Sequence, residues 1–454
     1  MTERELLRRA AELAADHLDT LETRPVYPHV SVEELTARID LPLPDGPTDA
    51  AIVVEELSAA LEPGVVASQS GRYFGFVVGS SLPAALAADV LVSAWDQNLG
   101  LLALGPSALV AENTAGAWTK DLLGIPAEAS FAFVTGCQTA HFTCLAAARQ
   151  HVLAEAGWDL NEQGLAGSPP ILVIVGAMRH STIDRALRYL GIGRAQIRVL
   201  DALPDGRLDP SALRDALAED KGPAIVCAQA GEVNTGVFDD LDAIADAVEG
   251  TGAWLHVDGA FGLWAAAAPS LSHLLAGSER ADSWATDAHK WLNVPYDCGI
   301  AFCAHPDAHR DSMTAHAAYY VRDPDAIREP IDWTPEHSRR ARAVPVYAAL
   351  RQLGRSGVAD LVERSCARAR QFAAAIAGLP GCQVLNEVVL NQVLFRFGDD
   401  DATSRTLAAV QTSGEAWMSG TEWDGHTAIR LSVSSWRTTE ADIDRTVAAF
   451  RRVT

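Results

Sequence analysis

Seven short apolar runs, separated by longer segments of helical pattern, constrain the fold of this chain more than any other feature. The runs are FAFVT (131–135), ILVIVGA (171–177), QIRVL (196–200), AIVCAQA (224–230), AWLHVDGA (253–260), SWATDA (283–288) and GIAFCA (299–304). Apolar runs of this length, bounded by turns and helices, are typical of strands buried on both faces of a parallel sheet. We therefore predict an α/β fold with a mainly parallel seven-stranded sheet flanked by helices.

The pattern changes on either side of this region. Residues 1–60 begin with the amphipathic, charged segment MTERELLRRAAELAADHLDT, and we predict an N-terminal helical segment there, followed by a large domain over 61–345. Residues 346–454 combine helical segments with the strand-like stretches CQVLNEVV, NQVLFRFGDD and AIRLSVSSW, which predict a smaller C-terminal α+β domain. The Pro- and charge-rich segment 322–338 is predicted to be an exposed loop.

Composition excludes several classes of partner. The 454 residues carry a net charge of −23, so neither nucleic acid nor an anionic membrane surface is an expected partner. No run of about 18 apolar residues predicts a membrane span. The seven cysteines lack CxxC spacing, which favours free thiols in a reducing compartment, and with no signal-peptide pattern we expect a cytoplasmic protein.

Lys290 stands out because the chain has only three lysines, at 120, 221 and 290, against 33 arginines. Arginine serves as a permanent charge, but only lysine offers a primary amine that can lose its proton and attack a carbonyl. A lysine after a strand can also simply reach solvent. The reactive interpretation requires companions at the same sheet edge, where ligands of open parallel sheets bind.

Three motifs place such companions after other strands. TGCQTAH (135–141) follows a strand and opens a helix, which is a common phosphate site, although many strand–helix turns carry a glycine. LHVDGAFG (255–262) ends a strand with Asp258, a carboxylate that needs a partner such as a ring nitrogen or an arginine. His180 in RHSTIDRA either caps the following helix or stacks on a bound ring.

Together these motifs resemble the pyridoxal 5′-phosphate enzymes of fold-type I, specifically the group II amino-acid decarboxylases. DAHKWLNVPYDCG is similar to that family's lysine motif, and HSRRARAVPVYAALRQLGRSG to the segment joining its two domains. The resemblance implies that Lys290 forms the Schiff base, Asp258 binds the pyridine nitrogen, and His180 and Ala260 lie on the two ring faces. It implies phosphate binding by Gly136, Cys137, Gln138 and His289, with Asn234 near the ring's phenolic oxygen. It places Phe74 and Phe76 of YFGFVVGSSLP in the substrate pocket, and it implies a homodimer with no metal.

Three positions depart from the family pattern. Thr139 replaces a usual glutamate in the phosphate loop, and Glu232 stands where an uncharged residue is usual, which could favour a cationic substrate. Pro330 occupies the position of the loop tyrosine that protonates the carbanion in animal aromatic decarboxylases. Tyr319, Tyr320 or an acid from a partner subunit could replace that tyrosine.

The expected activity is therefore decarboxylation of an amino acid, and the phenylalanines near residue 74 permit an aromatic one. The alternative is another reaction on the same scaffold: transamination, carbon–sulfur or carbon–carbon lysis, or oxidative deamination. Arg430 bears on this choice, because some fold-type I aminotransferases hold the α-carboxylate with an arginine in a similar late strand. A non-catalytic binding protein would lack a Lys290-bound chromophore.

Overall fold

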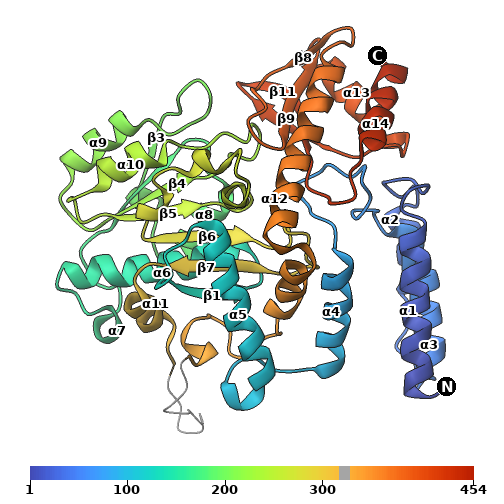
Figure 1. The fold of residues 1–454 in the computed structure, drawn as a ribbon, viewed down its shortest axis with the longest axis horizontal. Coiled ribbons are helices and arrows are strands. Elements are labelled where there is room, and N and C mark those ends of the chain that lie inside the picture. The colour runs from blue at the N-terminus through green and yellow to red at the C-terminus, as the bar shows by residue number, and fades with distance from the viewer. Residues whose placement is uncertain (316–327) are drawn as a thin grey trace. The chain divides into compact units, whose positions relative to one another are not determined.

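The computed structural model describes residues 1–315 and 328–454, and the chain forms two compact units (Figure 1). The sheet unit comprises residues 79–367 and 386–392, and the terminal unit comprises residues 1–78, 368–385 and 393–454. The predicted boundaries at residues 60 and 345 stay a prediction; the chain changes unit at residues 78, 367, 385 and 392.

The sheet unit contains the predicted seven-stranded sheet, in the order β1-β7-β6-β5-β4-β2-β3. Its strands are β1 (Ser130–Val134), β2 (Leu172–Gly176), β3 (Ile197–Leu200), β4 (Ala224–Gln229), β5 (Trp254–Asp258), β6 (Ser283–Asp287) and β7 (Gly299–Cys303). Only β7 runs against its neighbours, pairing antiparallel with both β1 and β6. The carboxyl ends of β1, β5 and β6 therefore meet the amino end of β7 at one edge of the sheet.

Helices cover the sheet because its strands are apolar on both faces. In β1, β5, β6 and β7 every residue is buried. Helix α6 (Cys137–Glu155) contacts β1, β4, β5, β6 and β7 and packs beside α8 (Ser181–Tyr189). The other helices of this unit are α4 (Pro83–Trp95), α5 (Pro106–Leu123), α7 (Leu160–Gln163), α9 (Pro210–Glu219), α10 (Leu241–Val248) and α11 (Pro306–Met313). The sheet edge that bears the predicted site is thus carried on a rigid, fully packed layer.

The terminal unit is built from both ends of the chain. It contains α1 (Glu3–Asp19), α2 (Val32–Ile39), α3 (Ala50–Leu61), α13 (Asp400–Thr412) and α14 (Glu440–Val453). Its sheet has the order β10-β11-β9-β8, from β8 (Cys382–Val384), β9 (Gln392–Phe397), β10 (Ser419–Trp423) and β11 (His426–Ser432). Strand β10 was not predicted, because its sequence SGTEW has only one large apolar residue. Helix α12 (Ala343–Ile376) links the units and is kinked at Gly354, whose φ of 60° suits glycine.

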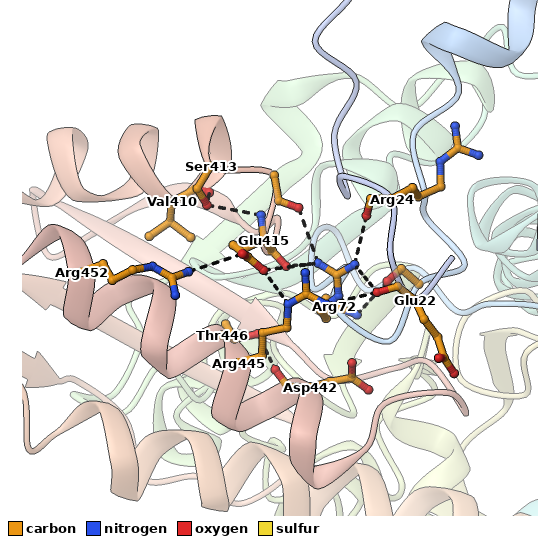
Figure 2. A network of polar contacts seen from close by, with 12 residues as sticks. Glu22, Arg24, Arg72, Val410, Ser413, Glu415, Asp442, Arg445, Thr446 and Arg452 are labelled. Carbon is orange, nitrogen blue, oxygen red and sulfur yellow. Dashed lines mark hydrogen bonds and ion pairs between the residues drawn. The ribbon is translucent and has the colours of Figure 1, made fainter. Parts of the chain in front are cut away.

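Arg72 ties the amino-terminal residues to the segment before β10 inside the terminal unit (Figure 2). Its side chain is 1% exposed, and Nη2 donates to the carbonyls of Glu22 and Arg24 at 3.2 and 3.0 Å. Nη1 donates to the carbonyl of Glu415, whose carboxylate also binds Arg445 Nε at 2.5 Å. A guanidinium has five N–H donors, and here they satisfy carbonyls that no regular element pairs.

The prediction of an exposed loop over 322–338 is wrong for residues 329–334, of which all but Trp333 are buried, and correct for the exposed residues 335, 337 and 338. Glu329 to Asp332 are buried, with Pro330 opening a 3₁₀ turn. Arg328 Nη1 donates to Glu112 Oε1 at 2.7 Å, and Arg339 binds both oxygens of the same carboxylate at 2.8 Å. These long-range ion pairs pull a polar segment into the interior, which local composition does not reveal. Residues 322–327, Tyr319 and Tyr320 lie outside the described residues. Among the helices that are described, none is both long and apolar enough to cross a bilayer.

Candidate active site

Lys290 lies in the turn that follows β6, at the predicted sheet edge. Its Nζ is 3.1 Å from Asp287 Oδ2, and its side chain is 20% exposed. Burial lowers the pKa of Lys290, but Asp287, Cys137 and Asp258 raise that pKa more, so it lies above its usual value. The backbone under this turn is tightly packed: a Cβ on Gly79 would lie 1.8 Å from the Lys290 carbonyl oxygen.

Asp287 organises the turn, although sequence reasoning did not single it out. It ends β6 and is 2% exposed. Its Oδ1 accepts a hydrogen bond of 2.6 Å from Cys137 N, the first amide of α6, while Oδ2 faces Lys290. An anion at a helix start is stabilised by the free N–H groups there. One carboxylate thus joins the lysine turn to the predicted phosphate loop.

His289 is a neutral hydrogen-bond donor in this arrangement. Its Nδ1 accepts from Cys298 N at 3.1 Å, so the proton belongs on Nε2, which lies 3.6 Å from Asp287 Oδ1. Burial lowers the pKa of His289 more than Asp287 raises it. The ring is stacked on Tyr296, with centroids 4.3 Å apart. The Nε2–H therefore points to the region between β6 and the start of α6.

Asp258 ends β5 on the same edge and is 5% exposed. Its Oδ1 accepts from Ala260 N at 3.1 Å, and its Oδ2 lies 3.4 Å from His141 Nε2. Burial raises the pKa of Asp258, but His141, His180 and Lys290 outweigh burial and hold that pKa well below its usual range. Asp258 is therefore an ionised carboxylate, oriented from two sides, in electrostatic range of the lysine.

His180 and Gln138 lie where α8 and α6 begin. His180 is the N-cap of α8, with Nδ1 2.8 Å from Thr182 Oγ1 and an exposed ring, so the capping interpretation is confirmed. Gln138 Nε2 donates to Thr182 O at 3.3 Å, which connects the two helix starts. Gln138 Oε1 is buried with no hydrogen-bond partner among the described residues, a polar atom left for a bound molecule.

Asn234 lies in a tight turn braced by Glu232. The Glu232 carboxylate is buried and accepts from Asn234 N and Nδ2 and from Thr235 N, each at 2.8 Å, and from Thr235 Oγ1 at 3.0 Å. Glu232 therefore stabilises this turn, and its carboxylate is no longer a reason to expect a cationic substrate. The role of Asn234 at the ring oxygen stays a prediction.

Phe74 and Phe76 belong to the terminal unit. Phe74 is buried, whereas Phe76 is 58% exposed and its ring centroid lies 5.3 Å from that of Trp417. Their assignment to the substrate pocket stays a prediction.

Two histidines were missed altogether. His141 and His256 are fully buried, and His141 Nδ1 lies 3.0 Å from His256 Nε2. Both stand inside the quoted motifs TGCQTAH and LHVDGAFG, at positions whose spacing shows nothing of their contact. Cys137, His141 and Asp258 place possible ligand atoms within 4.8 Å of one another. Burial, Asp287 and Asp258 raise the pKa of the Cys137 thiol, however, and a protonated thiol is a poor metal ligand.

A partly buried amine at the carboxyl edge of a parallel sheet, facing an ionised carboxylate and a helix start, is the arrangement of a pyridoxal-phosphate enzyme of fold-type I. The residues fit the cofactor. Gly136 has no side chain to fill the phosphate loop. A Cβ at this position would lie 3.3 Å from His289 Cε1. The Cys137 N–H already donates to Asp287, so Gln138 N and the Nε2–H of His289 would bind the phosphate. Asp258 would bind the ring nitrogen.

Comparison with known proteins assigns the family. The model of the pyridoxal-dependent decarboxylase conserved domain matches residues 33–398, and the chain belongs to this family. An aromatic-L-amino-acid decarboxylase of Bacillus atrophaeus is 27% identical, over 97% of this chain and 93% of its own. A 4-hydroxyphenylacetaldehyde synthase of Rhodiola rosea is 26% identical, over 95% and 91%. The structure of Oryza sativa TDC with PLP and tryptamine superposes with a TM-score of 0.93 at 24% identity, covering 99% and 97%. The chain is thus a pyridoxal-phosphate-dependent carboxy-lyase, as the sequence predicted.

Proposed function

We propose that this decarboxylase acts on an aromatic L-amino acid. Support comes from its relatives, which include aromatic-L-amino-acid decarboxylases of Bacillus atrophaeus and Rattus norvegicus. The observation that carries the proposal is the similarity to the Bacillus atrophaeus enzyme, which extends over 97% of this chain and 93% of that one.

In the proposed mechanism Lys290 supplies the amine that holds the cofactor, and Asp287 holds the proton of that amine. Pyridoxal 5′-phosphate, when bound, supplies an electron-accepting ring for the bond broken at the substrate α-carbon. Asp258, which accepts from Ala260 N and has His141 Nε2 3.4 Å away, would keep a proton on the ring nitrogen. The amino-terminal end of the α6 dipole and the Nε2–H of His289 would stabilise the negative charge of the phosphate.

His180 and Ala260 would lie on the two faces of the ring. His180 is anchored by its capping contact to Thr182, and this leaves its exposed ring in a fixed position. An imidazole so placed can also move a proton. Tyr319, Tyr320 or a residue of a partner subunit remains the candidate for the acid that protonates the product carbon.

A homodimer and a cytoplasmic location complete the proposal. Large apolar side chains are exposed on α3 (Ile52, Val53 and Leu57) and on α4 (Val90, Leu91 and Trp95). Exposed apolar patches of this kind mark interaction sites. The seven cysteines, all among the described residues, form no disulfide bonds, which suits a reducing compartment. Light scattering of the purified protein should give twice the 48.3 kDa chain mass.

The test is incubation of the purified protein with a panel of amino acids, recording product masses and carbon dioxide. An amine and carbon dioxide from an aromatic substrate support the proposal. Release of an aldehyde with ammonia, or of a keto acid, would replace it with oxidative deamination or transamination. Borohydride reduction and digestion should give a pyridoxyl group on the Lys290 peptide, and Lys290→Arg should give neither adduct nor turnover.

A further inference from the structure

Behind Asp258 lies a buried line of polar side chains that the proposed mechanism does not use. Trp254, His256 and Asp258 alternate along β5, so all three point to the same face of the strand. Ser283 of β6 is the register partner of His256, and its Oγ lies 2.8 Å from Trp254 Nε1 and 2.9 Å from His256 Nδ1. His141 of α6 bridges the next gap, 3.0 Å from His256 Nε2 and 3.4 Å from Asp258 Oδ2.

All five side chains are nearly or completely inaccessible: Asp258 is 5% exposed, Trp254 is 1% exposed, and the other three are 0% exposed. Polar groups buried in this way cost free energy unless each finds a partner. An ordinary core would fill this space with apolar side chains. The retention of two histidines and a serine in one continuous line therefore requires an explanation beyond packing.

The hydrogen-bonding capacity of each group allows one direction along the line. An indole N–H can only donate, so Ser283 Oγ accepts a hydrogen bond from Trp254. The Ser283 hydroxyl can then donate a hydrogen bond to His256 Nδ1. His256 then carries its proton on Nε2 and donates to His141 Nδ1. His141 in turn carries a proton on Nε2, which lies 3.4 Å from Asp258 Oδ2 and 3.4 Å from Cys137 Sγ. In this arrangement the protons point from Trp254 toward the carboxylate.

A second arrangement uses the same contacts. If His256 donates through Nδ1, its Nε2 accepts from His141 Nδ1, and His141 Nε2 still faces the ionised Asp258. In both arrangements His141 links His256 to Asp258. Burial already lowers the pKa of His256 to about 3, so His256 is not a source of extra protons.

We propose that His141 is a positioning residue for Asp258, the last link of a buried chain of polar contacts that begins at Trp254. The chain holds the Asp258 carboxylate ionised and aimed at the cofactor's ring nitrogen. This inference rests on the proposed function. The titratable groups around Asp258 are His141, His180, His256, Lys290, Cys137 and Cys227. Of these groups, His141 places its Nε2 3.4 Å from Asp258 Oδ2.

The test uses two cofactors and the apoprotein. Dissociation constants are measured by fluorescence titration for pyridoxal phosphate and for its deaza analogue, whose ring lacks the basic nitrogen. The wild-type protein should prefer pyridoxal phosphate, because only that ring can pair with Asp258. Wild-type protein that binds neither compound at Lys290 would refute the proposed function itself, and this inference with it.

In His141→Phe we expect binding of pyridoxal phosphate to weaken about tenfold and binding of the deaza analogue to change less than about threefold. A purely structural role would weaken both equally, and that outcome overturns the inference. His309→Phe is the matched control: His309 is also buried, with Nδ1 2.8 Å from Ser130 Oγ, but lies outside the chain. It should keep the wild-type preference.

A second variant keeps the test decisive if His141→Phe does not fold. Ser283→Ala removes one hydroxyl from the far end of the chain. It should reduce the preference for pyridoxal phosphate over the deaza analogue about threefold, with the dissociation constant of the deaza analogue unchanged. A preference unchanged in Ser283→Ala, in protein with a normal circular dichroism spectrum, would refute transmission along the chain.

Discussion

Gly79→Ala should disable the enzyme without unfolding it. Gly79 approaches the turn that carries the reactive lysine so closely that an added Cβ would lie 1.8 Å from the Lys290 carbonyl oxygen and 3.0 Å from that of His289. Both of these neighbours are backbone atoms, so no side-chain rotation relieves the overlap.

The size of the disturbance follows from these distances. Real Cβ contacts are essentially never shorter than 3.0 Å, so the Lys290 turn and the segment around Gly79 must separate by about 1.2 Å. A displacement of about 1 Å at a catalytic group costs on the order of 100-fold in rate, whereas overpacking of this kind costs about 1–3 kcal/mol of stability. We therefore expect a loss of at least about 100-fold in kcat/KM in a protein that remains folded.

The assay is carbon dioxide release with the best substrate of the panel, alongside thermal unfolding. Gly46→Ala is the matched control, because no atom lies within 4 Å of a Cβ there, and it should retain wild-type activity. If Gly79→Ala kept activity within about twofold of Gly46→Ala, the claim that this contact fixes the lysine would be refuted.

Three further predictions concern charge. Asp287→Asn removes the carboxylate that raises the pKa of Lys290 most, so labelling of Lys290 by trinitrobenzenesulfonate at pH 8 should accelerate about tenfold, measured against Lys221 in the same digest. Glu112→Gln leaves two buried arginines without their shared carboxylate and should cost about 3–5 kcal/mol in urea unfolding; a cost below about 1 kcal/mol would contradict this. Burial raises the pKa of Asp239 to about 6, against the donation of two backbone N–H groups. The folded state therefore binds the Asp239 proton more tightly than the unfolded state does. The stability that this proton contributes is fully present below about pH 4 and is lost as pH rises through 6. The Asp239→Asn variant should lack this loss, seen as a flatter dependence of the unfolding midpoint on pH.

The fold was largely predictable because its signal is local. All seven strands of the large sheet lie within two residues of the predicted apolar runs, since burial on both faces demands continuous apolar sequence. Strand β10 escaped because glycine and polar residues interrupt it. The burial of Glu329 escaped because Arg328 is drawn inward by Glu112, more than 200 positions away in the sequence.

The site residues also separate into those that the sequence reveals and those that only a contact reveals. Lys290 and Asp258 could be found because their chemistry is rare and their strand ends are visible in the sequence. Asp287 and His141 could not, because each matters through a partner on another element: Cys137 N for one and Asp258 for the other. Residues that orient other residues leave no local pattern, and only the contact reveals them.

The composition of the terminal unit has a consequence for biosynthesis. Its first 78 residues leave the ribosome about 290 residues before the next segment of the same unit, which starts at residue 368. At about 5–20 residues per second, that interval lasts roughly 15–60 s. For that time Val26 N and Phe74 N lack the carbonyls of Gly414 and Trp417 that they bind in the folded unit, and chaperones that shield nascent segments would govern the yield of active enzyme.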